Sequence, residues 1–163
     1  MEMNARAAQL IADLDLNPHP EGGHYRRMFR SEALVRPDDD RTGRAALTSV
    51  YYLLASGEVS RWHRVASDEV WHFYEGAPLV LYRADPNCGE LSRVLLGPVA
   101  ADAQPVSAVP RNHWQAARST GAYTLVGCTV GPGFDFNDFT LLRDLPEQAE
   151  RMRNAHPEMA PML

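Results

Sequence analysis

The chain has 163 residues, of which 45% are hydrophobic and 23% charged, a composition typical of one folded domain with a continuous core. Its net charge of −5 provides no basic surface for a phosphate backbone, so we expect no nucleic-acid partner. The longest apolar runs fall far short of the roughly 20 residues of a membrane helix, and the first residues carry acids instead of a secretory signal, so we expect a cytoplasmic protein without membrane contact.

Helical spacing of apolar residues is confined to the two ends of the chain. Ala8, Ile11 and Ala12 can share one helix face, which predicts a helix over about residues 4–13 that the phrase NPHPEGG then ends. Near the other end, a proline and the polar run EQAERMRNAH predict a second helix over about residues 145–156.

Between these helices the pattern predicts short strands separated by turns. Val, Tyr, Trp, Phe, Thr and Leu are concentrated in runs that Gly, Pro, Asn or Asp interrupt at short intervals. The segment RPDDDRTGR is the clearest solvated loop. The expected strands are 24–31, 46–55, 58–65, 69–75, 78–84, 91–96, 106–110, 114–118, 122–130 and 139–142.

This spacing is typical of a sandwich or a barrel. We therefore predict an all-β fold with short flanking N- and C-terminal helices. No repeat or linker divides the sequence, which favours a single domain over residues 1–163 with its barrel core at about 22–143.

Residues 60–76, SRWHRVASDEVWHFYEG, concentrate ionisable and aromatic side chains in one short span. We interpret the span as a hairpin, in which the length of the connection decides whether His63 lies beside Glu69, because side chains alternate across a strand. A three-residue connection, ASD, places four side chains on one face: His63, Glu69, Trp71 and Phe73. A two-residue connection separates His63 from Glu69 instead. The hydrophobic pattern favours the three-residue connection.

The same stretch resembles a motif of a known superfamily. In GEVSRWHRVASDEVWHFYEG, Gly57 is followed by five residues and His63, then by Glu69, and then by six residues and Gly76. This order resembles the first motif of the cupin superfamily, G-x5-H-x-H-x3,4-E-x6-G. The second histidine of that motif is replaced by Val65.

A second stretch, VPRNHWQAA, resembles the second cupin motif, P-x-G-x-x-H. Pro110 is in place, Asn112 replaces the glycine, and Gln115 replaces the histidine. Three longer phrases, NPHPEGGHYRRMFRS, SDEVWHFYEG and GCTVGPGFDFNDFTLL, resemble a cupin subfamily whose domain has no assigned function, over about residues 14–143. The resemblance implies a jelly-roll β-barrel with a pocket inside it, usually a homodimer, and it supplies no activity.

The resemblance also allows metal binding to be judged by ligand count. A cupin metal site typically gathers three histidines and a glutamate, and the matching positions here hold His63, Val65, Glu69 and Gln115. Valine cannot bind a metal, and a glutamine oxygen is a weak ligand compared with imidazole. We therefore expect no required cofactor, while a weakly held divalent ion on His63, Glu69 and Gln115 stays open.

Without a metal, His63 and Glu69 form a candidate proton-transfer pair. Imidazole has a pKa near 6.5, and burial raises the pKa of a carboxyl group, so the two groups can exchange acid and base roles near neutral pH. By analogy with metal-free cupins, we expect an isomerase or epimerase acting on a small polar substrate of the sugar or carbonyl type. The alternatives are a non-catalytic module that binds a small metabolite and a weakly metal-binding oxygenase.

Other candidates for the pocket follow from the same strands. We expect Gln115 to donate a hydrogen bond to a substrate carbonyl, and Trp71 and Phe73 to form walls that exclude water. Arg61 shares strand parity with His63, so its guanidinium either holds an anionic group of the substrate or lies exposed at the end of the barrel.

The phrase PHPEGGHYRRMFRS is interpreted as an arm next to a Gly-Gly pair. It either packs over the barrel or against a partner subunit, or completes the pocket, and Tyr25 and Arg26 are its candidate substrate contacts. In GPGFDFNDF, we expect Phe134, Phe136 and Phe139 to seal the barrel or to become buried at a dimer interface.

Overall fold

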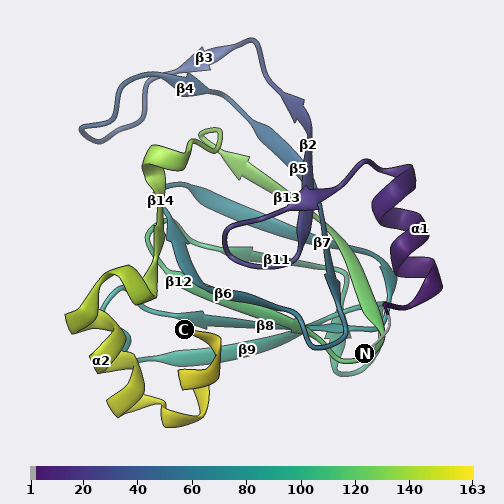
Figure 1. The fold of residues 1–163 in the computed structure, drawn as a ribbon. Coiled ribbons are helices and arrows are strands. Elements are labelled where there is room, and N and C mark those ends of the chain that lie inside the picture. The colour runs from purple at the N-terminus through teal and green to yellow at the C-terminus, as the bar shows by residue number, and fades with distance from the viewer. Residues whose placement is uncertain (1–2) are drawn as a thin grey trace.

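Two six-stranded sheets face each other, and one α-helix packs outside each of them (Figure 1). The structure is a computed structural model that describes residues 3–163. In spatial order, the first sheet contains β1 (Asn17–Pro18), β2 (His24–Arg30), β5 (Thr48–Ala55), β13 (Tyr123–Gly131), β7 (Asp68–Gly76) and β11 (Val106–Val109). The second contains β10 (Ala103–Gln104), β9 (Leu91–Leu96), β8 (Leu79–Ala84), β12 (Trp114–Ser119), β6 (Val59–Val65) and β14 (Phe139–Leu141). Strands β3 (Leu34–Val35) and β4 (Arg44–Ala45) form a separate small ribbon.

The all-β prediction is confirmed. Each of the ten runs expected to be a strand forms one, and the strands that the sequence did not indicate, β1, β3, β4 and β10, are two residues long. All strand pairs are antiparallel except β9 with β10. The sheets stay separate in their hydrogen bonding, so the barrel is closed by side chains packed between the sheets.

The apolar side chains of the sheets divide into an inner and an outer set, as alternation along a strand requires. Leu54, Trp71, Leu81 and Val126 belong to the inner set, which fills the space between the sheets. The outer faces are covered by α1 (Ala5–Asp13) on the first sheet and α2 (Pro146–Ala155) on the second, each within one residue of the expected range. Neither helix in residues 3–163 is long and apolar enough to cross a membrane.

The predicted hairpin between β6 and β7 is wrong. Strand β6 pairs with β12 and β14, whereas β7 pairs with β13 and β11, so the two strands lie in different sheets. The residues between them, Ala66 and Ser67, carry the chain across from the second sheet to the first. His63 and Glu69 are therefore not neighbours along one sheet face but approach each other from facing sheets.

The loop expected over residues 36–44 joins β3 to β4 and is anchored to the body of the protein. Arg44 makes a two-pronged ion pair with Asp138, with nitrogen–oxygen distances of 2.8 and 2.9 Å. Arg41 donates to the same carboxylate at 3.2 Å and to Ser67 at 2.8 Å. Asp138 closes the short 3-10 turn Phe136–Asp138 that precedes β14, so these contacts tie the loop to that turn.

Candidate functional site

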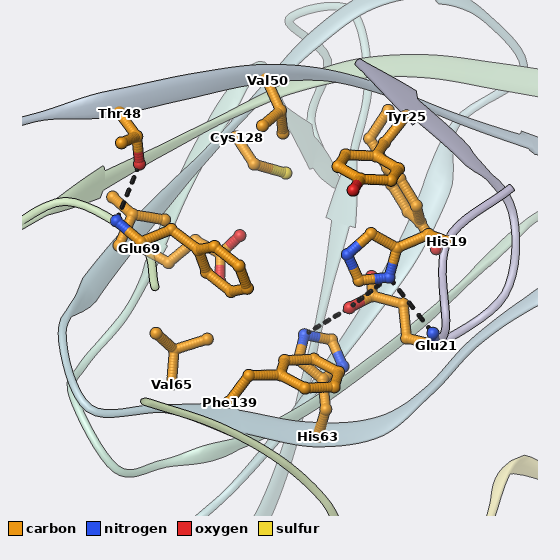
Figure 2. Close-up of a pocket in the computed structure, with 13 residues that line it drawn as sticks. His19, Glu21, Tyr25, Thr48, Val50, His63, Val65, Glu69, Cys128 and Phe139 are labelled. Atoms are coloured by element: carbon orange, nitrogen blue, oxygen red, sulfur yellow. Dashed lines mark hydrogen bonds and ion pairs between the residues drawn. The ribbon is translucent and has the colours of Figure 1, made fainter. Parts of the chain in front are cut away.

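A small cavity lies between the two sheets, at the end of the sandwich where β6 ends and β7 begins (Figure 2). Its volume is about 50 Å³, which is enough for a few water molecules or one small chemical group. We call it the inner cavity. Its polar lining residues are His19, Glu21, Tyr25, Thr48, Tyr52, His63, Glu69 and Cys128, and its apolar ones are Val50, Val65, Val130, Phe134 and Phe139. His63 and Glu69 thus line the same space, from two different walls.

Glu21 reaches the inner cavity from the segment between β1 and β2. The two glycines that follow it, Gly22 and Gly23, have φ values of 109° and 70°, which residues with a side chain rarely adopt. A Cβ atom at Gly22 would also collide with the carbonyl oxygen of Val59. The turn therefore packs directly on β6, where the carbonyl of Glu21 accepts a hydrogen bond from the backbone N–H of Arg61 at 2.8 Å. This contact fixes the carboxyl group of Glu21 inside the barrel.

Glu21 and His63 lie within hydrogen-bonding distance of each other. The Nδ1 atom of His63 lies 2.7 Å from the carbonyl oxygen of Arg61, which can only accept, so Nδ1 carries a hydrogen and donates it. The Nε2 atom of His63 lies 3.2 Å from Oε2 of Glu21. This second contact is a hydrogen bond when one proton lies between the two atoms, on the imidazole or on the carboxyl group.

Burial decides on which side that proton rests. Glu21 is 7% exposed and His63 is 2% exposed. Burial raises the pKa of Glu21 above its ordinary value and lowers the pKa of His63, against the attraction of Glu69. Both shifts favour the uncharged pair, with the proton on Oε2 of Glu21. The other oxygen, Oε1, accepts a hydrogen bond from the hydroxyl of Ser60 at 2.8 Å.

His19 contributes a hydrogen-bond donor to the same space. Its Nδ1 accepts the backbone N–H of Glu21 at 3.1 Å, so in the neutral ring the hydrogen is on Nε2. Figure 2 shows this other ring nitrogen turned toward the middle of the cavity. Burial lowers the pKa of His19, which favours the neutral ring. An N–H group aimed at the cavity suits the oxygen atom of a bound carbonyl.

Glu69 is held by a relay of buried hydrogen bonds. The indole N–H of Trp71, which can only donate, binds Oε1 of Gln115 at 2.8 Å and so fixes the orientation of the amide. The Nε2 group of Gln115 then donates to Oε2 of Glu69 at 2.6 Å. Gln115 is 1% exposed and does not line the inner cavity. Its contact is with Glu69, which it positions.

Replacing Gln115 with Met, which has a similar volume, is expected to lower the free energy of unfolding by about 2–6 kcal/mol. The change removes the partners of two buried polar groups, each worth about 1–3 kcal/mol. Urea denaturation measures the loss. Adding Trp71→Phe removes the orphaned indole N–H, so the double variant should lose less than the sum of the two single variants. Additive losses would contradict the relay.

Replacing Glu69 with Gln is expected to make stability less sensitive to alkali. Burial raises the pKa of Glu69, so the folded wild-type protein keeps a proton that the unfolded chain releases above its ordinary pKa of 4.5. Wild-type stability from this group is complete below that pH and is lost as the pH rises. The stability of Glu69→Gln relative to wild type should therefore increase as the pH rises above about 4.5 in urea titrations. A constant difference would contradict the shift.

The remaining predicted site residues are divided among three places. Tyr25 lines the inner cavity, and Arg26 lies in an exposed recess outside it. Trp71 and Phe73 are part of the core between the sheets and do not line the inner cavity. The guanidinium of Arg61 does not line it either, and this residue serves the site through its backbone, which binds both Glu21 and His63.

The functional residues that the sequence analysis did not select are His19 and Glu21. Both belong to the phrase PHPEGG, which was interpreted as an arm with Tyr25 and Arg26 as its contacts. Two consecutive glycines indicate a backbone that can approach another segment closely, but the sequence does not show that the carboxyl group before them is buried. Phe139 seals the cavity as expected, with its ring centre 5.4 Å from that of His63.

The residues at the cupin ligand positions do not fit a metal ion. Gln115 does not line the cavity, its oxygen accepts from Trp71 and its amide nitrogen faces Glu69. Val65 lines the cavity with an aliphatic side chain, and Nε2 of His63 lies 3.2 Å from Oε2 of Glu21. Within residues 3–163, no group of three His, Cys, Asp or Glu side chains has a geometry suited to a metal.

Comparison with known proteins decides the family. A family model described as "Cupin superfamily (DUF985)" matches residues 8–142. This chain is a cupin. The predicted cupin jelly roll is thereby confirmed, and the substituted motif positions, Val65 and Gln115, belong to a true family member. No curated protein shows significant similarity to the sequence.

Solved structures of similar cupins cover the whole chain. A protein from Shewanella oneidensis shares 36% identity with a TM-score of 0.80, over 98% of this chain and 94% of its own. A hypothetical protein from Leishmania major shares 29% identity with a TM-score of 0.81, over 96% and 95%. A dTDP sugar isomerase from Desulfovibrio desulfuricans, at 15% identity and a TM-score of 0.54 over 80% and 89%, is similar in fold alone.

Proposed function

We propose that this cupin is a metal-independent isomerase or epimerase that moves a proton next to the carbonyl group of a small polar substrate. The observation that carries the proposal is the 3.2 Å contact between Nε2 of His63 and Oε2 of Glu21, at the wall of a cavity that Glu69 enters from the facing sheet. A dTDP sugar isomerase is among the solved cupins of similar fold, but its likeness supports the fold only.

The two walls supply the two groups that enolisation requires. The carboxylate form of Glu69 takes the proton from the carbon next to the carbonyl, and the electron pair of that C–H bond forms the carbon–carbon double bond. The Glu21–His63 pair releases its proton to the carbonyl oxygen, which becomes the hydroxyl of the enol. Return of the protons to a different carbon or a different face gives the isomer or the epimer.

The surroundings favour this chemistry near neutral pH. Burial raises the pKa of Glu69, which makes its carboxylate a stronger base than an exposed one. The Nε2–H group of His19 provides a second hydrogen bond for the oxygen that gains charge during the reaction. Phe134 and Phe139 keep bulk water away from the intermediate.

The test has two steps. A thermal-shift screen of metabolites identifies ligands, because a compound that binds the folded state raises its apparent stability. Each ligand is then incubated with the protein in deuterium oxide, and proton NMR follows the exchange of hydrogens next to its carbonyl group. We expect at least one ligand whose exchange requires the protein. Ligands that bind without exchange would overturn the proposal and identify a non-catalytic binding module.

A further inference from the structure

The inner cavity opens toward a larger and more exposed recess. The two spaces share four lining residues, Tyr25, Thr48, Val50 and Phe134, so the recess lies at the mouth of the inner cavity. We call it the outer recess. Its volume is about 670 Å³, against about 50 Å³ for the inner cavity. A substrate larger than a few atoms therefore places one end inside and the rest in the outer recess.

The charge of the outer recess is positive, although the protein as a whole is acidic. Three arginines line it, Arg26, Arg27 and Arg30, against one carboxylate, Asp135. Among the ion pairs within residues 3–163, none involves these three arginines. Asp135 accepts the backbone N–H of Asn137 at 2.9 Å as the cap of the 3-10 turn. The recess thus presents positive charge that the protein itself leaves unneutralised.

A bulge in β2 brings two of these arginines, Arg27 and Arg30, to one side of the strand. Arg27 pairs with Val50 and Phe29 pairs with Ser49, so Met28 is an extra residue in the strand. In a regular strand, Arg27 and Arg30 are three positions apart and point to opposite faces. Because Met28 is an extra residue, the alternation of side chains shifts by one position after it. Arg30 therefore points to the same side of the strand as Tyr25 and Arg27. Arg27 and Arg30 therefore lie on the same face of β2 as Tyr25, which lines the inner cavity.

Arg26 reaches the outer recess from the neighbouring position. Its guanidinium donates one hydrogen bond, to the carbonyl oxygen of Leu14 at 3.3 Å. An arginine side chain matches phosphate and carboxylate groups because its N–H donors form a planar fork. Arg27 and Arg30 lie on the cavity side of β2, so their donors are the ones best placed to meet an anion in the outer recess.

We propose that the outer recess binds a phosphate or carboxylate group of the substrate, while an uncharged carbonyl end of the same molecule enters the inner cavity. The substrate class is then a small phosphorylated or carboxylated carbonyl compound. The carbonyl half of this statement rests on the proposed function, and the anion half rests on the arginines alone. The substrate thereby spans a neutral, enclosed end and a positive, open end.

Isothermal titration tests the anion half with inorganic phosphate and acetate as separate probes. The wild-type protein should bind at least one of them, and the stronger of the two identifies the anionic group. The variant Arg27→Gln/Arg30→Gln should bind that probe about tenfold more weakly or worse, because it loses two charged hydrogen-bond donors. Arg143→Gln is the matched control, since Arg143 is exposed and lies outside both spaces.

Dihydroxyacetone phosphate and dihydroxyacetone test the two halves together. The phosphorylated probe should bind about tenfold more tightly or better, and this preference should disappear in the double arginine variant and shrink as salt is added. Equal binding of the two probes, or unchanged anion binding by the double variant, would overturn the inference. Anion binding without deuterium exchange in any ligand would contradict the proposed function alone. Deuterium exchange that is equally fast in the wild-type protein and in the double arginine variant would contradict anion binding in the outer recess alone.

Discussion

The His63→Asn variant is expected to exchange the carbon-bound hydrogen of its ligand about 10²–10⁴-fold more slowly than the wild-type protein. Asparagine lacks the imidazole Nε2 that lies 3.2 Å from Oε2 of Glu21, so Glu21 loses the base with which it exchanges its proton during the reaction. The measurement is the rate of deuterium incorporation by NMR, with a ligand from the thermal-shift screen and at saturating concentration.

Ligand binding separates this effect from damage to the cavity. The affinity of His63→Asn for the same ligand should stay within a few fold of wild type, because Tyr25, His19 and Glu69 remain in place. Arg143→Gln, far from both spaces, should keep the full exchange rate. An exchange rate in His63→Asn equal to that of wild type would show that the shared proton has no part in the reaction.

The second large effect concerns Asp138, whose side chain is 3% exposed and bridges Arg41 and Arg44. Replacing it with Ala is expected to lower the free energy of unfolding by about 3 kcal/mol, since the nearly buried Arg44 loses its counterion and Arg41 loses one of two. For a chain of this size, Tm should fall by about 6–12 °C. Calorimetry or urea denaturation measures both. Asp39→Ala, which removes a more exposed partner of Arg41, should cost under about 1 kcal/mol.

The loss at Asp138 should depend on pH in a definite direction. Burial alone raises the pKa of Asp138, but hydrogen bonds from Arg44 and Arg41 outweigh it and hold the pKa below the ordinary value of 3.8. The stabilisation by the carboxylate is therefore complete above that pH and is lost as the pH falls through the folded pKa. The difference between wild type and Asp138→Ala should shrink in acid. A difference that persists undiminished below about pH 3 would contradict this assignment.

The fold was largely predictable because its information is local. A run such as AYTLVGCTV has β-branched and aromatic residues between turn-forming residues, and it forms β13. The helix that follows a proline near residue 146 likewise depends on a few adjacent residues. Strands of two residues, such as β10, carry too little pattern to be recognised.

The pairing of strands was not predictable from the same information. The connection between Val65 and Asp68 is short enough for a hairpin, and nothing in its sequence distinguishes a turn within one sheet from a crossing between two. That choice depends on which other strands compete for β6 and β7. His63 and Glu69 were nevertheless placed in one cavity by the family resemblance, for a geometric reason different from the one inferred.

The site was predicted in part, and the residues that were wrongly included or missed each have a physical reason. Strand parity placed Trp71 and Phe73 with Glu69, but the space between the sheets is filled by side chains away from its open end, so only Glu69 reaches the cavity. Glu21 was missed because its position depends on contacts of Gly22 and Gly23 with strands far along the chain. Such close packing of glycines is visible only in three dimensions.

Because His63 lies on β6 of the second sheet and Glu69 on β7 of the first, the gap between these two side chains is set by the thickness of the layer packed between the sheets. Leu81 and Val126 are members of that layer, remote from any bound molecule. Enlarging or shrinking such side chains changes the distance between the two sheets, and with it the distance between His63 and Glu69. The rate of the proposed reaction should therefore depend on how tightly the space between the sheets is packed.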